Sequence, residues 1–316
     1  MNLSLFDTHC DTAFELYRRN EGLRDNSCHI SLSHANPYNR YVQLFAIWSD
    51  RRLDDQTCWD DFLKIADYFD HLNEQEQQSI VRIRTRTELE QAVEASKRAA
   101  VLAVEDARLL AGDIERLHVL YAKGVRCMTL LWGGETCIGG SHNTDVGLTD
   151  FGKRVVRGCF ELGIIPDISH ASEQSVDDVI EIANQYQKPF IATHSNSYSA
   201  YAHSRNLRDR HLAELMRLGG VVGVSMCPSH LRDCSKQNAG VEDVVRHIER
   251  YLELGAQDHL CFGCDFDGTD LPNGIDHVDD LYKVADMLSK RGCSTQLIEN
   301  IFWKNAFAFF RNQFTL

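Results

Sequence analysis

Six side chains of metal-binding or acid–base type stand at or directly after the ends of apolar runs in this sequence. They are far apart along the chain: His9, Asp11, Glu105, His170, His194 and Asp265. Imidazole nitrogens and carboxylate oxygens are common ligands of zinc and similar cations, and a carboxylate can also transfer protons. His9 and Asp11 are two residues apart, so an extended strand would point both to the same side. We therefore expect these residues to meet in a metal-dependent catalytic site.

Each residue also has an ordinary structural interpretation. Asp11 could cap a following helix, and Glu105 could pair with Arg108 at the surface. Asp265 lies in a Gly-Cys-Asp-Phe-Asp-Gly segment, and chemistry alone does not choose between it and Asp267. The shared position of all these groups at the ends of apolar runs is what favours a common site.

The number of candidate ligands indicates how many ions the site would hold. His9, Asp11, Glu105, His170 and His194 exceed the three protein ligands that a single catalytic zinc usually takes. Two ions ~3.5–4 Å apart would fit if one carboxylate bridged them. Glu105 is the natural bridge, because it stands between the first pair and the two later histidines. We therefore expect two divalent metal ions, most readily zinc.

Eight short apolar runs supply the elements that must position these groups. They cover residues 3–9, 42–48, 99–105, 125–132, 163–170, 188–194, 220–226 and 259–265. Such runs are typical of strands buried on both faces of a parallel sheet, and helical periodicity fills the segments between them. Thr87 with Glu90, for example, predicts a capping box. The alternation predicts an α/β fold, a closed (β/α)8 TIM barrel with its active site at the carboxyl ends of the strands.

We expect the chain to form one domain with a single helical insertion. Residues 50–98 are more than one crossover helix needs, which predicts a helical insertion after the second strand. Barrels of this length are usually one domain, so residues 1–316 are interpreted as a single domain.

The composition argues against nucleic acid and membranes as partners and against disulfide bonds. The formal net charge is −13, and an acidic surface repels phosphate backbones, so we expect no nucleic acid. No apolar run approaches the ~20 residues of a membrane span, and the N-terminal segment lacks a signal-peptide pattern. We therefore expect no membrane partner and a cytoplasmic location. The eleven cysteines are odd in number and irregularly spaced, which favours reduced thiols.

With these residues in hand, the sequence resembles the membrane dipeptidase (renal dipeptidase) family in its soluble bacterial form. The resemblance extends from Phe-Asp-Thr-His-Cys-Asp at 6–11 to Asn305 near the end. Its most specific motifs are Asp-Ile-Ser-His at 167–170, Thr-His-Ser at 193–195, His-Ser-Arg-Asn at 203–206 and the segment at 263–268. Together these motifs are hard to obtain by chance.

The resemblance implies a binuclear zinc dipeptidase that cleaves the peptide bond of dipeptides by metal-bound hydroxide. By motif match, His9 and Asp11 would hold one zinc, and His170 and His194 the other, with Glu105 bridging.

The resemblance also assigns catalytic and substrate-binding roles. Asp265 would take a proton from the nucleophilic water and deliver it to the leaving amine, so Asp265 and Glu105 are the catalytic candidates. Arg205 would bind the free carboxylate of the substrate, because a guanidinium grips a carboxylate in a fixed bidentate geometry. The ordinary alternative for Arg205 is a surface salt bridge with Asp209.

Three departures from the family bear on the substrate. Trp132 stands where mammalian members have a substrate-contacting histidine, and His142 in the same loop could partly replace it. Ser-Met-Cys at 225–227 stands where the family often has Asn-Phe-Tyr. Asp106 follows Glu105 in place of a usual glycine, which predicts added negative charge near the mouth. Trp132, His142 and Arg205 are therefore the substrate-binding candidates.

Other functions stay open at this point. The first is a related metal-dependent amidohydrolase, a deacylase or lactonase, with a substrate other than a dipeptide. The second is a non-catalytic barrel that binds a metal or a small ligand, against which the presence of Asp265 argues. The sequence does not give the oligomeric state, with a homodimer among the options.

Overall fold

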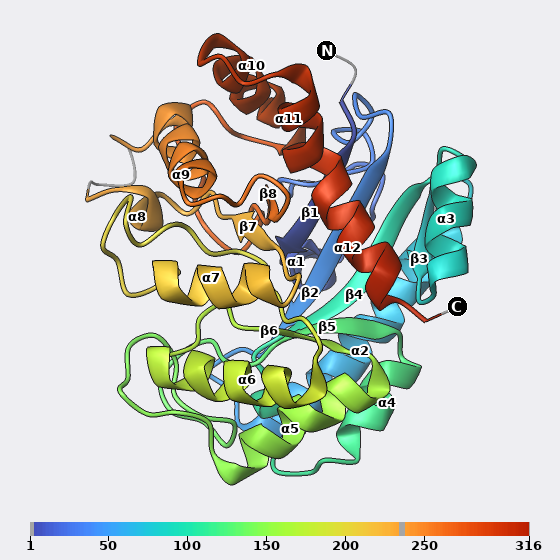
Figure 1. Ribbon diagram of the computed structural model, residues 1–316. Coiled ribbons are helices and arrows are strands. Elements are labelled where there is room, and N and C mark those ends of the chain that lie inside the picture. The colour runs from blue at the N-terminus through green and yellow to red at the C-terminus, as the bar shows by residue number, and fades with distance from the viewer. Residues whose placement is uncertain (1–2, 234–237, 316) are drawn as a thin grey trace.

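The computed structural model describes residues 3–233 and 238–315, which form a curled parallel sheet surrounded by helices (Figure 1). The strands follow the order β6-β5-β4-β2-β1-β8-β7, and β3 pairs with β4 off this path. Their bounds are β1 Leu5–Cys10, β2 Tyr41–Trp48, β3 Ile80–Ile83, β4 Arg98–Glu105, β5 Val125–Thr129, β6 Ile165–Asp167, β7 Val222–Val224 and β8 Leu260–Phe262. The pairings between these strands are parallel. The predicted class, a barrel-like α/β fold, is confirmed.

The segment predicted as the sixth strand, 188–194, is not a regular strand. It makes two isolated parallel bridges, from Ile191 to Asp167 of β6 and from Ala192 to Val222 of β7. These bridges join the two ends of the curled sheet.

Close packing around Thr193 accounts for this irregularity. The hydroxyl of Thr8 donates to the Thr193 carbonyl oxygen at 2.6 Å. A Cβ added at Gly263 would lie 1.6 Å from that oxygen, and one added at Gly223 would lie 2.0 Å from it. The two glycines therefore allow neighbouring strands to approach a backbone turned inward at Thr193.

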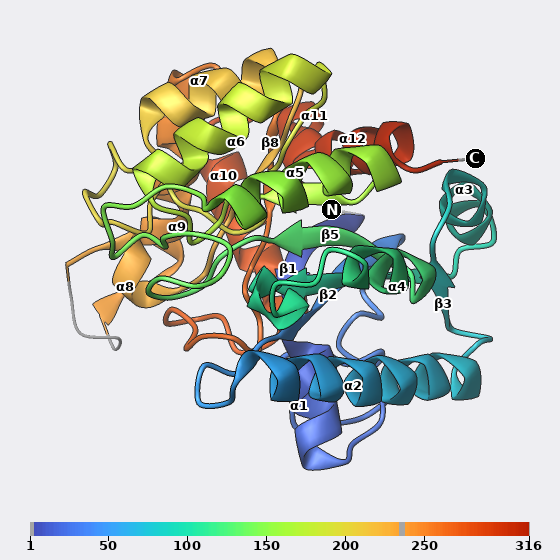
Figure 2. The same ribbon diagram turned by 90° about the horizontal axis from the view of Figure 1, so that it is seen from below.

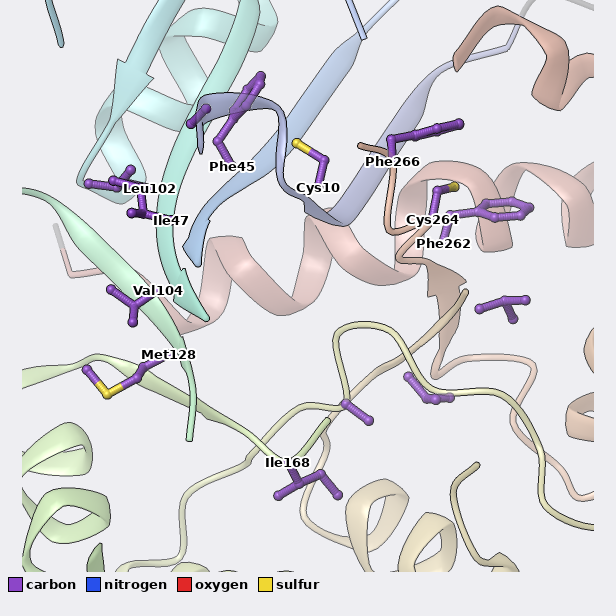
Figure 3. Close-up of a cluster of buried hydrophobic side chains, with 14 of the residues drawn as sticks. Cys10, Phe45, Ile47, Leu102, Val104, Met128, Ile168, Phe262, Cys264 and Phe266 are labelled. Carbon is purple, nitrogen blue, oxygen red and sulfur yellow. The ribbon is translucent and has the colours of Figure 1, made fainter. Parts of the chain in front are cut away.

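Alternate residues of the long strands enter two different apolar cores, which is why their sequences are apolar throughout. Phe45 and Ile47 of β2 belong to the first core (Figure 3). The ring of Phe45 lies 4.8 Å from that of Phe69 in α2 (Asp55–Gln75). The intervening residues of β2 and β4 share a second core with α12 (Asn305–Gln313): Val42, Leu44, Ala46, Val101, Ala103, Phe309 and Phe310.

The helices cover the outside of the sheet, with α1 and α2 on one side and α5, α6 and α7 on the other (Figure 2). The remaining bounds are α1 Thr12–Arg19, α3 Arg86–Glu94, α4 Arg116–Ala122, α5 Asp150–Leu162, α6 Glu173–Tyr186, α7 Asp209–Arg217, α8 Pro228–Leu231, α9 Val241–Glu253, α10 Tyr282–Lys290 and α11 Thr295–Glu299. Among the described residues, no helix combines the length and the apolar character that a bilayer span requires.

The segment predicted as a helical insertion, 50–98, contains α2 and α3 with the short strand β3 between them. The predicted capping box was wrong by two residues. Thr85 accepts from the Glu88 backbone N–H, and the Glu88 side chain accepts from the Thr85 N–H. Two Thr-x-x-Glu patterns overlap here, and the extended backbone of Thr85 selects the first. Glu90 pairs with Arg311 instead.

Candidate metal centre and substrate pocket

A pocket of about 470 Å³ opens at the carboxyl ends of the strands. Seven of the nine predicted site residues line it: Asp11, Glu105, Trp132, His142, His170, Arg205 and Asp265. The other two are buried next to Glu105: His194 lies beneath the pocket against Glu105 and His170, and His9 lies beside the same carboxylate. The structure therefore brings together all the residues that were singled out at the strand ends.

Three ligand-type atoms converge at one point of this site. The Nε2 atoms of His170 and His194 lie 3.0 Å apart, and they lie 3.1 Å and 3.4 Å from Oε1 of Glu105. In a tetrahedral zinc site with metal–nitrogen distances of about 2.0–2.1 Å, ligand atoms are roughly 3.3 Å from one another. The spacing of these three atoms therefore suits a single ion of that size.

Hydrogen bonds made by the Nδ1 atoms of His170 and His194 determine that the Nε2 atoms carry no proton. Nδ1–H of His170 donates to the Trp132 carbonyl at 3.1 Å. Nδ1–H of His194 donates at 2.7 Å to the Thr193 hydroxyl, which in turn donates to Asp167. Both Nε2 atoms consequently carry lone pairs and face each other and a carboxylate. Lone pairs in this arrangement repel unless a cation lies between them, so the residues fit a metal ion.

A second group of ligand-type atoms lies on the other side of Glu105. Nε2 of His9 is 3.6 Å from Glu105 Oε1 and 3.8 Å from Asp11 Oδ2. This nitrogen and Oδ1 of Asp11 are buried and make no hydrogen bond within the described chain. Glu105 thus belongs to both groups, which is the position that a bridging carboxylate would occupy.

Burial dominates the titration of these groups. It raises the pKa of Glu105 well above its usual range, and the Asp11 carboxylate adds to this effect. It lowers the pKa values of His170 and His194 well below normal, which keeps both imidazoles neutral and able to bind metal. Burial also opposes a charged His9, but the carboxylates of Glu105 and Asp11 outweigh it and raise the pKa of His9 to about 10. The raised pKa of Glu105 means that burial disfavours its charged form, and a bound cation would stabilise that form.

Asp265 and Asp267, which chemistry alone did not separate, differ clearly in their surroundings. Both oxygens of Asp267 are occupied: they accept from the Thr12 hydroxyl at 2.5 Å and from the His29 backbone N–H at 2.7 Å. Asp265 makes no such side-chain bond within the described residues, and its Oδ1 lies 3.9 Å from His9 Nε2. Burial raises the pKa of Asp265 to about 7. A carboxyl group with a pKa near neutrality is suited to accept and return a proton.

The backbone is held in an uncommon conformation at several of these positions. His170, Asp265 and Asp267 have φ values of 70°, 63° and 67°. A Cβ at Gly268 would lie 2.0 Å from Oδ2 of Asp11. Left-handed backbone at non-glycine residues is concentrated at functional sites, where surrounding contacts maintain it.

Arg205 is buried and does not form the surface salt bridge with Asp209. Its Nη2–H donates to the His194 carbonyl at 3.2 Å, and its Nε has no partner within the described chain. Asp209 instead accepts from Ser199 and lies near Arg250. A buried guanidinium with spare donors facing a pocket is suited to bind an anionic group.

The structure excludes the ordinary alternative for Glu105 and corrects the expectation for Asp106. Glu105 does not pair with Arg108, which binds Asp55 and the carbonyls of Asp50 and Leu53. Asp106 does not add charge to the mouth, because its side chain is buried away from the pocket and accepts from the Arg108 N–H at 3.2 Å.

Sequence reasoning missed several residues that line the pocket, including Phe14, Trp48, Arg51 and His230. Trp48 ends β2, so its position at a strand end is the sequence signal for it, although its side chain is neither a metal ligand nor an acid–base group. The other three lie on loops or in the first turns of helices, where the apolar runs give no signal.

Imidazoles and carboxylates gathered at the carboxyl ends of a curled parallel sheet define the class of metal-dependent barrel hydrolases. The model of the membrane dipeptidase family (peptidase family M19) matches residues 1–315, and the chain belongs to this family. It is accordingly a metallopeptidase that acts on dipeptides.

Solved structures and curated sequences agree with this family. The chain matches the crystal structure of a family M19 metallopeptidase, dipeptidase AC, with a TM-score of 0.92, 25% identity and 100% coverage of both chains. It matches a metallopeptidase from Rhodobacter sphaeroides with a TM-score of 0.91, 24% identity and coverage of 99% and 100%. The dipeptidase tcpJ of Claviceps purpurea is 31% identical over 67% of this chain and 50% of its own length, so the match spans half of that relative.

Proposed function

We propose that this dipeptidase holds two divalent ions, most readily zinc, through the residues gathered around Glu105. His170 and His194 would hold one ion, and His9 and Asp11 the other, with Glu105 bridging. The observation that carries this proposal is the convergence of two unprotonated Nε2 atoms and a buried carboxylate within 3.4 Å of one another. When bound, the ions would supply an activated water and would polarise the carbonyl of the scissile bond.

The protein's own residues would bind and orient the substrate and move protons. Arg205, with its unpartnered Nε, would hold the free carboxylate at one end of a dipeptide. Asp265 would accept a proton from the attacking water and return it to the leaving amine, because its side chain lines the same pocket and makes no hydrogen bond in the described part of the chain. Trp132 and His142 would contact the substrate from the pocket wall. The Rhodobacter relative was crystallised with a phosphinate mimic of the dipeptide L-Ala-D-Ala, which supports a substrate of this size.

Metal analysis combined with a substrate panel tests this proposal. The purified protein should contain close to two zinc per chain, and a chelator should remove both the metal and the activity. Dipeptides should be hydrolysed faster than N-acyl amino acids or lactones of similar size. A preference for an acyl or lactone substrate would favour the deacylase or lactonase alternative, for which the absence of a tyrosine at Cys227 is the specific support. One tightly bound ion with full activity would refute the binuclear site.

We also propose a cytoplasmic location and a single domain spanning residues 1–316. The cysteines within the described residues are unpaired, which supports a reducing compartment. The homodimer stays a prediction.

A further inference from the structure

Aromatic rings form a continuous wall on one side of the pocket. The ring of Trp132 lies 5.9 Å from that of His170, Trp48 lies 5.1 Å from Trp132, and Phe14 lies 5.7 Å from Trp48. All of these residues line the pocket. The two tryptophans are only partly buried and belong to neither apolar core, so their exposed faces are available to a ligand. We call Phe14, Trp48 and Trp132 the aromatic wall.

Trp48 and Arg51, at and just after the end of β2, lie on the opposite side of the barrel from Arg205, and Trp132, which follows β5, lies between them. Around the sheet the order is β1, β2, β4, β5, β6, the bridging segment at Ile191 and Ala192, β7 and β8. Trp48 ends β2, whereas Arg205 follows the bridging segment, which is four positions away in a ring of eight. If the terminal carboxylate is held by Arg205, the other residue of a dipeptide extends past Glu105 toward the wall.

Arg51 stands at the outer edge of this wall. Its guanidinium carbon lies 5.8 Å from the centre of the Trp132 ring, and the residue lines the pocket. In the described part of the chain, Arg51 makes no ion pair, whereas its neighbour Arg52 pairs with Asp50. Stacking on an aromatic face orients a guanidinium without consuming its hydrogen-bond donors. Arg51 is therefore an unneutralised cation with free donors at the pocket rim.

Arg51 is a positive charge in a pocket whose other charged lining residues are mostly acidic. The acidic groups that line the pocket are Asp11, Glu15, Glu105, Asp265 and Asp267, and the only other arginine among the described lining residues is Arg205. Glu15 is already paired with Arg18 and Arg19, so it does not neutralise Arg51. A substrate side chain that reaches the wall thus meets apolar faces first and a positive charge beyond them.

We propose that the aromatic wall and Arg51 form a subsite for an acidic side chain on the N-terminal residue of the dipeptide, glutamate before aspartate. The methylene groups of such a side chain would pack on Trp48 and Trp132, and its carboxylate would bind Arg51. This inference rests on the proposed function, because it takes the orientation of the substrate from Arg205.

Matched pairs of dipeptides test the subsite. Glu-Ala and Gln-Ala differ by one charge at nearly constant shape, and Ala-Glu and Ala-Gln place the same difference on the C-terminal residue. The wild type should prefer Glu-Ala over Gln-Ala about two- to fivefold in kcat/KM, chiefly through KM, which is the range for a partly exposed charge pair. It should show a smaller preference for Ala-Glu over Ala-Gln. Raising the salt concentration should reduce the first preference.

Two neighbouring arginines provide the variant and its control. Arg51→Gln should lower kcat/KM for Glu-Ala about two- to fivefold and leave Gln-Ala unchanged. Arg52→Gln removes the same charge one residue away and should change neither substrate. Equal rates for Glu-Ala and Gln-Ala in the wild type, or the same loss for both in Arg51→Gln, would overturn the subsite. Failure to hydrolyse any dipeptide would instead contradict the proposed function, so the two failures are distinguishable.

Discussion

The Nε2 atoms of His170 and His194 lie 3.0 Å apart, and each histidine gives its Nδ1 proton to another acceptor. Two imidazole lone pairs at this distance are stable next to a buried carboxylate only if a cation neutralises them. The pair is therefore the most direct sign of the metal centre in this chain.

Removing one of these ligands should remove both metal and activity. We expect His170→Ala to lower kcat/KM by roughly a thousandfold or more, because the ion supplies several kcal/mol of transition-state stabilisation. Elemental analysis should show less than the wild-type metal content. His118→Ala on the exposed face of α4 is the control and should change neither quantity. Full turnover by metal-stripped His170→Ala would refute the role.

The Thr193 hydroxyl should matter through the orientation of His194. Thr193→Val keeps the shape but removes the link between His194 Nδ1 and Asp167. Outer partners of this kind are typically worth 10–100-fold in metal affinity, so zinc affinity should fall by about that factor. A competition titration with a chelator measures it, and saturating zinc should restore much of the activity. Unchanged affinity would show that the hydroxyl only fills space.

Arg205 should determine the requirement for a free carboxylate. Arg205→Ala should raise KM for dipeptides about 10–100-fold, the usual range for a charged hydrogen bond, and should affect C-terminally amidated substrates much less. Because the arginine is buried, Arg205→Lys serves as a second variant that keeps the charge while losing the bidentate geometry. Equal effects on free and amidated substrates would remove Arg205 from carboxylate binding.

Asp265 and Asp267 should respond differently to the same substitution. Asp265→Asn should lower kcat about 10²–10⁴-fold with the metal retained, since it removes a proton acceptor whose side chain makes no hydrogen bond within the described residues. Asp267→Asn should mainly lower thermal stability, because Asp267 holds the Thr12 hydroxyl and the His29 backbone. Kinetics, metal analysis and thermal melting of both variants separate these outcomes, and the reverse result would exchange the two roles.

The convergence of the candidate ligands could be predicted from the sequence because each stands where an apolar run ends. Glu105 follows six apolar residues, and His170 and His194 follow buried segments in the same way. The carboxyl ends of parallel strands meet at one end of a barrel, so the position of each residue at a strand end was enough to predict that they lie close together.

Other features depend on contacts that position does not encode. The turn at Thr193 follows from the Thr8 hydroxyl and from the glycines of two other strands. Asp106 points away from the mouth because Arg108 and a left-handed backbone hold it there. Trp48 and Arg51 belong to ordinary residue types, and only the geometry of the pocket distinguishes them.

His247 should make the stability of the fold depend on pH. It is fully buried, accepts from the Ser197 N–H at 3.1 Å and donates to the Leu231 carbonyl at 2.9 Å, an arrangement that requires the neutral ring. Burial lowers the pKa of His247 from 6.5 to about 4. Between these values the unfolded chain binds a proton that the folded chain does not, so stability falls as the pH drops below 6.5 and continues to fall until about 4.

The loss from this one residue between pH 8 and pH 5 should be about 2 kcal/mol. Urea unfolding in the presence of a chelator measures it without a contribution from bound metal. His247→Gln can keep both hydrogen bonds but cannot titrate. Between pH 8 and pH 5, the free energy of unfolding of this variant should therefore fall by about 2 kcal/mol less than that of the wild type. His71→Gln on the exposed face of α2 should retain the full loss of the wild type. The same pH dependence in His247→Gln and in the wild type would show that other groups cause the acid sensitivity.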